Sequence, residues 1–203
     1  MASYLIHMCV CDEVNKVIKK DRKKILIGSI APDIAKLVGI NRSVTHFGEY
    51  PEIDMKLFLS KYGSNLNDDF VLGYFIHLYT DYLWDKYFIS NIYKDGILIK
   101  IDGSKLNYNE DISEYLYKDY DSLTSDIINE YNIDLSFLKE DIPQIDKIIE
   151  EVPIDKLNII TEKTNQFINR NIKSELNVMN MSSINEFVLL CKNKIINKLG
   201  KIV

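Results

Sequence analysis

The chain contains only 3 histidines, His7, His46 and His77, and all of them lie in its N-terminal half near apolar segments. His77 and Asp81 are four residues apart in a segment with helical periodicity, so both side chains leave one face of a helix, about 5–6 Å apart at Cβ. This spacing lets an imidazole and a carboxylate bind one ion. The same spacing also makes a buried histidine hydrogen-bonded to a carboxylate one turn on.

A second carboxylate and a second histidine lie upstream of this pair. Asp33 ends the run Gly28-Ser29-Ile30-Ala31-Pro32-Asp33, where glycine and proline impose a defined turn after a buried apolar stretch. A rigid turn can hold a carboxylate for a ligand, although an aspartate in this place also serves as a helix N-cap. His46 lies in Thr45-His46-Phe47, a polar connection in which a histidine is also an ordinary loop residue.

Helical periodicity dominates the elements that must position these residues. The most apolar segment, 68–93, predicts a central helix, and Gly73 within it favours the close approach of a neighbour. Residues 96–103 are rich in isoleucine and bracketed by glycines, which predicts a short β-hairpin or an irregular excursion. We therefore predict an all-α, multi-helix bundle that forms a single domain over residues 1–203. Further helices are predicted over 4–20, 33–38, 51–62, 110–131, 135–151, 155–179 and 182–199, the last capped by Ser182 or Ser183 with Glu186.

Composition excludes several classes of protein. With 46% hydrophobic and 27% charged residues, 8 Gly and 4 Pro, the chain of 203 residues can bury a sizeable core and is not of the disordered type. Its 25 basic and 30 acidic side chains give a formal charge of -5, which argues against a dedicated nucleic-acid-binding role. The sequence has no apolar run of ~18 residues and no pattern of a signal peptide, so we expect a cytoplasmic protein without a transmembrane segment. The 3 cysteines are odd in number, and Cys9 and Cys11 are too close for a zinc knuckle, which predicts reduced, partly buried thiols.

The order of the motifs resembles the zinc-dependent phospholipase C family, which is similar in fold to the P1-type nucleases. The resemblance covers roughly residues 4 to 90 and runs through His7, Gly-Ser-Ile-Ala-Pro-Asp at 28–33, Thr-His-Phe at 45–47 and Gly-Tyr-Phe-Ile-His-Leu-Tyr-Thr-Asp at 73–81. It implies an all-α fold of the phospholipase C type with a metal centre. By this resemblance one ion is bound by Asp33, His46, His77 and Asp81, a second ion by His7 with Asp81 as the bridge, and Asp33 and Asp81 are also expected to be catalytic.

The chain departs from that family downstream. The family completes a three-metal cluster with further histidines and a glutamate, whereas no histidine follows His77 here. The nearest replacement carboxylates are Asp85, Asp119 and Asp121, for which the alternative is a solvated surface position. We expect one or two ions. Oxygen and nitrogen ligands without a thiolate suit Zn, and they would also accept Fe, Mn or Ni.

Hydrolysis is the chemistry that such a centre performs. A dication held by carboxylates and imidazoles lowers the pKa of bound water toward ~7, and a second ion about 3.5–4 Å away neutralises charge on a phosphate. We expect a metal-dependent hydrolase of a phosphodiester or phospholipid-like substrate, with a small-molecule or lipid-like phosphoester as its partner. One alternative is a nucleotide phosphohydrolase with a His/Asp site, which the lack of an adjacent His-Asp doublet weakens. The other is a non-catalytic helical protein with a structural metal site; the sequence indicates no oligomeric state.

Overall fold

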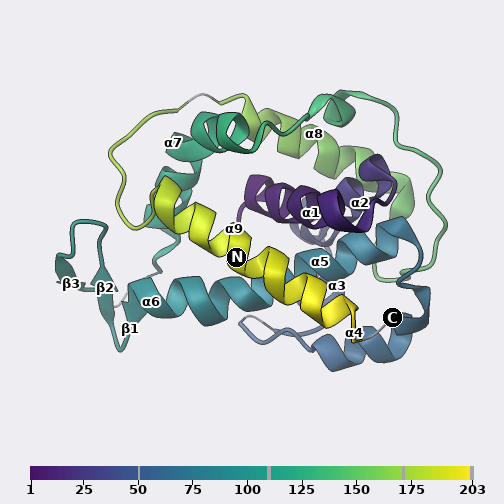
Figure 1. Ribbon diagram of the computed structural model, residues 1–203, viewed down its shortest axis with the longest axis horizontal. Coiled ribbons are helices and arrows are strands. Elements are labelled where there is room, and N and C mark those ends of the chain that lie inside the picture. Colours follow the sequence, from purple (N-terminus) through teal and green to yellow (C-terminus); the bar gives the residue numbers. More distant parts are fainter. Residues whose placement is uncertain (50, 109–110, 171, 202–203) are drawn as a thin grey trace.

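Helices make up most of the structure. The computed structural model describes residues 1–49, 51–108, 111–170 and 172–201, and it is 64% helical, which confirms the predicted all-α class. Figure 1 shows the arrangement of the elements. The described α-helices are α1 (Tyr4–Ile18), α2 (Arg22–Gly28), α3 (Arg42–His46), α4 (Met55–Tyr62), α5 (Asp69–Leu83), α6 (Ser90–Ile92), α7 (Ser113–Tyr131), α8 (Leu157–Ile168) and α9 (Met181–Leu199). Shorter helical segments are η1 (Ala31–Leu37), η2 (Gly63–Asn65), η4 (Ser136–Lys139) and η5 (Ile154–Lys156), which are 3₁₀ turns, and η3 (Trp84–Ile89), a π-helical turn.

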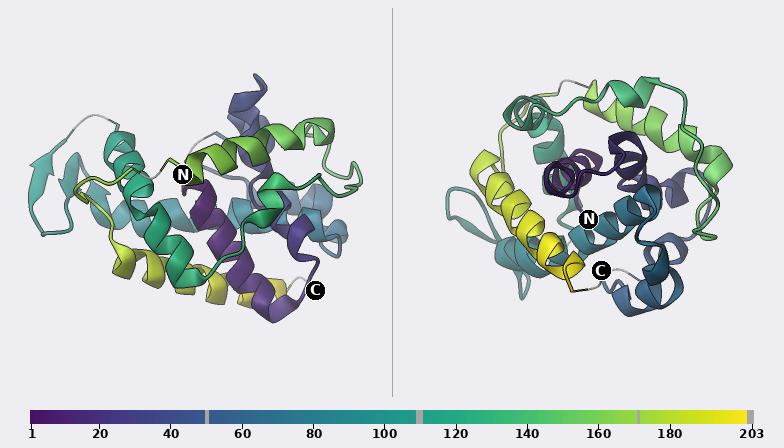
Figure 2. Two further views of the ribbon diagram at one scale, coloured as in Figure 1. Left: turned by 90° about the horizontal axis from the view of Figure 1, so that it is seen from above. Right: turned by 45° about the vertical axis from the view of Figure 1, so that its right-hand side comes forward.

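Helix α1 lies at the centre of the bundle. It begins where the Ser3 hydroxyl accepts a hydrogen bond from the amide of Ile6, and it ends at Lys19, which has a left-handed backbone conformation. Helices α2, α5, α7, α8 and α9 all contact it, and the right-hand view of Figure 2 shows α1 surrounded by the others. His7 on this helix is therefore completely buried.

Two glycines bring α2 and α5 unusually close together. A Cβ atom on Gly73 would overlap the carbonyl oxygen of Ile25 and lie 3.1 Å from the Cα of Gly28. A Cβ atom on Gly28 would in turn overlap the carbonyl oxygen of Phe70. The close approach predicted for Gly73 is confirmed, and Gly28 is its counterpart on the other helix.

The predicted hairpin is confirmed as part of a three-stranded antiparallel sheet with the order β1–β2–β3. The first turn uses Asp95 and Gly96, both with positive φ, as tight hairpins require. The sheet lies at one end of the molecule (Figure 1), where Leu98 is its fully buried side chain. Its strands are β1 (Tyr93–Lys94), β2 (Ile97–Ile99) and β3 (Lys105–Asn107).

Two predicted helices are wrong in whole or in part. Residues 140–149 form no helix, because Pro143 has no amide N–H to donate, and Glu151 ties the end of this segment to α4 through Lys61 and Tyr62. The helix predicted over 155–179 ends at Ile168, and the described residues from there to Asn180, 169–170 and 172–180, form no helix.

Other boundaries shift less. The helix predicted from residue 51 begins at Met55 after the capping carboxylate of Asp54, and α9 is capped by Asn180 with Ser183 rather than by Ser182 or Ser183 with Glu186. The segment predicted over 68–93 changes from α5 to the π-turn η3 at Trp84. The predicted start of α7 at Glu110 lies outside the described residues.

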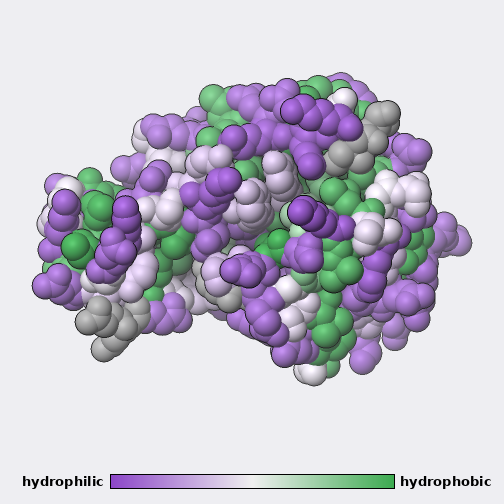
Figure 3. All heavy atoms as spheres, turned by 90° about the horizontal axis from the view of Figure 1, so that it is seen from below, coloured by the Kyte–Doolittle hydropathy of each residue, from purple (hydrophilic) through white to green (hydrophobic). Residues whose placement is uncertain are grey.

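The surface of the described residues carries few large apolar side chains. Figure 3 shows one face, on which polar residues predominate and apolar residues gather in separate groups. No helix in the described ranges is long and apolar enough to span a membrane. Cys9, Cys11 and Cys191 are unpaired and buried, which confirms the free thiols predicted from the sequence and places them deeper than expected.

Candidate metal centre

Two histidines and two aspartates, all predicted ligands of one ion, converge in the structure. The Nε2 atoms of His46 and His77 face each other at 3.2 Å. Asp33 Oδ1 lies 3.5 Å and 4.0 Å from these two nitrogens, and Asp81 Oδ2 lies 3.7 Å and 3.8 Å from them. Ligand atoms around a single zinc ion are separated by about 3.0–3.6 Å, and the separations among Asp33, His46 and His77 are close to this range. Asp81 is within 4 Å of both nitrogens, but it belongs with His7 and His77 to a second group of residues able to hold an ion.

The outer nitrogens of the same imidazoles bind backbone carbonyls. His77 Nδ1 lies 2.8 Å from the carbonyl oxygen of Ser29, and His46 Nδ1 lies 3.2 Å from that of Arg42. Because a carbonyl oxygen only accepts, each Nδ1 carries the proton, and in the neutral ring each Nε2 then presents a lone pair. Two lone pairs pointing at each other in a buried site repel unless a cation lies between them. Metal-ligating histidines usually have this second hydrogen bond to a carbonyl or a carboxylate.

The charge states agree with this arrangement. Burial, followed by the neighbouring His7, lowers the pKa of His77 to about 3, so its ring is neutral at neutral pH. Burial alone would raise the pKa of Asp81, but the contact with His7 and the nearby imidazole of His77 hold it well below its usual range. The site at neutral pH therefore offers ionised carboxylates at Asp33 and Asp81 and a neutral imidazole at His77, the forms that bind a metal ion.

Thr45 links the segments that carry the upstream ligands. Its hydroxyl donates to the carbonyl of Pro32, which fixes α3 against η1 beside Asp33. The Tyr74 hydroxyl of α5 donates to the carbonyl of Thr45. Asp33, expected as a possible N-cap, is in fact inside η1, where no side chain caps the N-terminus. His46 is the last residue of α3 rather than a loop residue. The sequence analysis did not predict this short helix.

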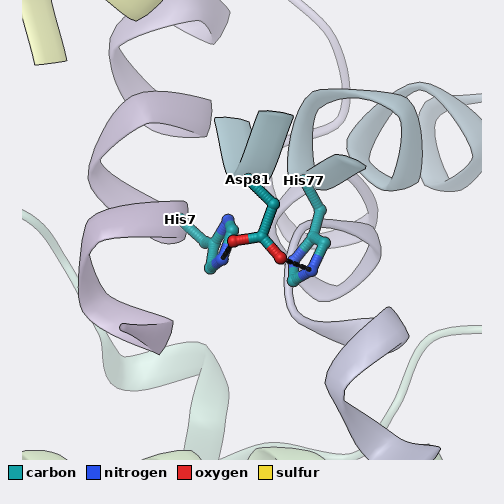
Figure 4. A group of neighbouring side chains, drawn as sticks. All are labelled: His7, His77 and Asp81. Carbon is teal, nitrogen blue, oxygen red and sulfur yellow. Dashed lines mark ion pairs between the residues drawn. The ribbon is translucent and has the colours of Figure 1, made fainter. Parts of the chain in front are cut away.

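His7 lies beside the four ligands in a second arrangement. Its ring stacks on that of His77, with ring centroids 3.8 Å apart, and its Nε2 lies 3.3 Å from Asp81 Oδ1. Figure 4 shows His7 and His77 on either side of the Asp81 carboxylate. His7 Nδ1 has no hydrogen-bond partner in the described part of the chain. Within the described residues, His7, His77 and Asp81 form one group able to hold an ion, and Asp33, His46 and His77 form another.

Two neighbours of Asp81 were missed by the sequence analysis. Arg42 Nη2 donates to Asp81 Oδ2 at 2.8 Å, and the backbone amide of Ala2 donates to Asp81 Oδ1 at 3.1 Å. Arg42 lies one helical turn before His46, so the two side chains share a face of α3. Had α3 been predicted, this spacing would have indicated that Arg42 lies near the centre. A backbone amide leaves no signal in the sequence.

Asp33 connects the centre to the surface. Its side chain is 11% exposed, whereas those of His46 and His77 are 0% exposed. It lines a groove of about 210 Å³ between η1, the start of α1, and α8. A second hollow of about 450 Å³ shares Lys36 and Tyr117 with this groove and also contains Arg42. The groove therefore reaches the centre at Asp33.

The three downstream carboxylates do not join the centre. Among the described residues, neither ion-holding group contains Asp85, Asp119 or Asp121. Asp119 is buried, not a solvated acid, because its oxygens accept hydrogen bonds from the amides of the loop that follows α8. Asp121 pairs with Arg170 at 3.5 Å. The amides bound by Asp119 are those of Asn177, Val178 and Met179.

Comparisons with known protein families, with curated proteins and with solved structures find no match to this chain.

Proposed function

We propose that the protein is a metal-dependent phosphoester hydrolase in which Asp33, His46, His77 and Asp81 hold one divalent ion. The observation that carries this proposal is the pair of buried Nε2 atoms 3.2 Å apart, each with its Nδ1 proton committed to a carbonyl. A bound dication activates water as a nucleophile at neutral pH and offsets negative charge on a phosphate. Zn fits this ligand set, and Fe, Mn or Ni are accepted by the same donors.

The side chains of the centre have distinct parts in this reaction. Asp33 is the ligand that reaches the groove. In the proposed reaction its carboxylate would accept a proton from the attacking water. Asp81 positions its neighbours, because its two oxygens face His7 on one side and Arg42 on the other. Lys36 lines both the groove and the second hollow, and Arg42 lines the second hollow, so both side chains supply positive charge near the centre, which favours an anionic substrate. This motif order is the one that resembles zinc-dependent phospholipase C, and we extend the proposal to a phosphodiester substrate on that basis.

A second ion between His7 and Asp81 stays a prediction. The unpartnered Nδ1 of His7 and the 3.3 Å separation of Nε2 from Asp81 Oδ1 support it. The number of metal equivalents in the purified protein distinguishes one ion from two.

Elemental analysis of untagged protein, purified without chelator, tests the metal centre. We expect one or two equivalents of a transition metal in wild type and loss of metal in His77→Ala. Ile76→Val on the same helix is the matched control and keeps its metal, because this buried neighbour contributes no ligand. If the folded wild type contains no metal, even after reconstitution, the proposed metal centre is wrong.

Hydrolysis of bis(p-nitrophenyl) phosphate with added Zn, Mn or Fe tests the activity. Turnover in wild type that is lost in His77→Ala supports the hydrolase. A folded, metal-loaded protein that turns over neither this compound nor a phospholipid would instead have a structural metal site.

A further inference from the structure

We propose that the groove beside Asp33 contains a second anion-binding position, formed by Lys163 and Arg170, for a phosphate group of the substrate that is not the one hydrolysed. The inference rests on the proposed function and names the substrate class: a phosphodiester that also carries a phosphomonoester.

The groove joins the metal centre to this position without interruption. In the 3₁₀ segment η1, Asp33 and Lys36 are three residues apart and so share one face. Helix α8 packs against η1 and supplies the opposite wall. Lys163 and Phe167 are one turn apart on α8, and Arg170 follows just past its end, so the three side chains face the groove together.

The charge of the groove is opposite to that of the whole chain. The chain has a formal charge of -5, yet the described lining of the groove holds three cations and one carboxylate, Asp33, which is a proposed metal ligand. Lys163 has no carboxylate within ion-pair distance among the described residues, and Arg170 has only the 3.5 Å pair with Asp121. Positive charge in a groove with apolar walls attracts an anion more strongly than the same charge on an open surface.

Two aromatic rings lie beside Arg170 in the groove. The Arg170 guanidinium lies over the Phe167 ring, 5.4 Å from its centroid, and Tyr4 meets the same ring edge-on at 6.0 Å. Burial raises the pKa of the Tyr4 hydroxyl, nearby Asp33 raises it further, and Arg170 lowers it, so Tyr4 lies within electrostatic reach of both. A guanidinium presents several N–H groups in one plane, the geometry that binds a phosphate through two oxygens.

A pair of chromogenic substrates isolates the second phosphate. Thymidine 5′-(p-nitrophenyl phosphate) has only the scissile diester, and its 3′-phosphate derivative adds a phosphomonoester. In wild type with metal we expect the 3′-phosphate to raise kcat/KM by about tenfold, as hydrogen bonds to a charged group do. In the double variant Lys163→Gln/Arg170→Gln we expect the ratio of the two kcat/KM values to fall to about one.

The control carries the same change in charge elsewhere. Lys105→Gln/Lys156→Gln replaces two exposed lysines outside the groove and keeps the wild-type ratio. Equal kcat/KM for the two compounds in wild type, or a ratio unchanged in Lys163→Gln/Arg170→Gln, would overturn the second position while leaving the hydrolase intact.

Calorimetric binding tests the second anion-binding position even if neither compound is hydrolysed. Absence of hydrolysis counts against the proposed function, not against this position. Metal-loaded wild type is expected to bind thymidine 3′,5′-bisphosphate about tenfold more tightly than thymidine 5′-monophosphate, and Lys163→Gln/Arg170→Gln to bind both equally. If the bisphosphate has no advantage in wild type, the position does not exist.

Discussion

At the centre, the location of the proton on each imidazole decides what the side chain can bind. Because the Nδ1 protons of His46 and His77 are held by carbonyl oxygens, the inward nitrogens have only lone pairs to offer. Arg42 is the positive charge already present, and it donates to the same Asp81 oxygen that faces both histidines. In the proposed centre, the metal and the Arg42 guanidinium would therefore share one carboxylate.

Replacing Arg42 distinguishes the effect of its positive charge on activity from any effect on metal binding. We expect Arg42→Gln to lower kcat/KM for bis(p-nitrophenyl) phosphate by about 100-fold, since one lost charged donor at a developing anion has an effect of that size. Arg42→Lys keeps the charge without the planar fork, and a smaller loss of about tenfold is expected. Elemental analysis of both variants should show wild-type metal content. Full activity in Arg42→Gln would exclude Arg42 from the reaction.

The neutral His77 makes the metal-free protein sensitive to acid. Its pKa falls from 6.5 to about 3 on folding, so between these pH values the unfolded chain binds the extra proton and stability decreases as the pH falls. We expect the free energy of unfolding of chelated protein to drop by up to about 1.4 kcal/mol per pH unit below pH 6.5. Urea titrations from pH 7.5 to 4.5 measure the slope. The slope should be shallower in His77→Gln, whose side chain does not titrate, and an identical slope there would contradict this origin.

At the scale of elements, the contact between α2 and α5 positions the centre. Gly28 and Gly73 allow the two helices to touch, and the residue after Gly28, Ser29, then places its carbonyl on His77, one turn beyond Gly73. A side chain at either glycine would push the carbonyl away from the imidazole.

Gly73→Ala should therefore damage both stability and metal binding. We expect a loss of about 2–3 kcal/mol in the free energy of unfolding, the usual cost of overpacking, because the new methyl group would overlap the carbonyl of Ile25. Weaker metal binding should accompany it. Gly63→Ala is the matched control, since a Cβ there meets only the Leu59 side chain at 3.9 Å, and it should be neutral within about 1 kcal/mol. Urea unfolding and metal titration of both variants make the comparison; equal effects would refute the role of the close contact.

The sequence predicts these elements unevenly, for physical reasons. Long amphipathic helices such as α1, α7 and α9 repeat their apolar pattern over several turns, so their existence could be predicted. Helix α3 is too short to show a period, and this hid Arg42 as a neighbour of the centre. The helix predicted through residues 169–179 fails because Asp119, distant in sequence, binds the amides of that segment. The ligand residues could be anticipated by type and order, but their distances, the carbonyl partners and the groove come from tertiary packing.

For the whole molecule, the ligands are spread over η1, α3 and α5, which the bundle brings together. A site absent from the unfolded chain adds its binding free energy to folding. At a free metal concentration 100 times the dissociation constant, metal binding adds about 2.7 kcal/mol to the free energy of unfolding.

Chelation should consequently lower the melting temperature of wild type. We expect EDTA to lower Tm by about 5–10 °C, given this free energy and a chain of this size. His77→Ala, which lacks a ligand, should show no response to EDTA. A wild-type Tm that does not change after metal is shown to be removed would mean that binding and folding are uncoupled.

The order of the ligands along the chain gives the ion one more property. Coordination of the proposed ion by Asp33, His46 and His77 would close the loops 33–46 and 46–77, so the ion would act as a cross-link between distant parts of the backbone. Unlike a disulfide, this cross-link opens reversibly when the ion is scarce. Newly made chains in a metal-poor medium are then expected to spend longer in open forms and to be degraded faster, so the abundance of the protein would follow the supply of its metal.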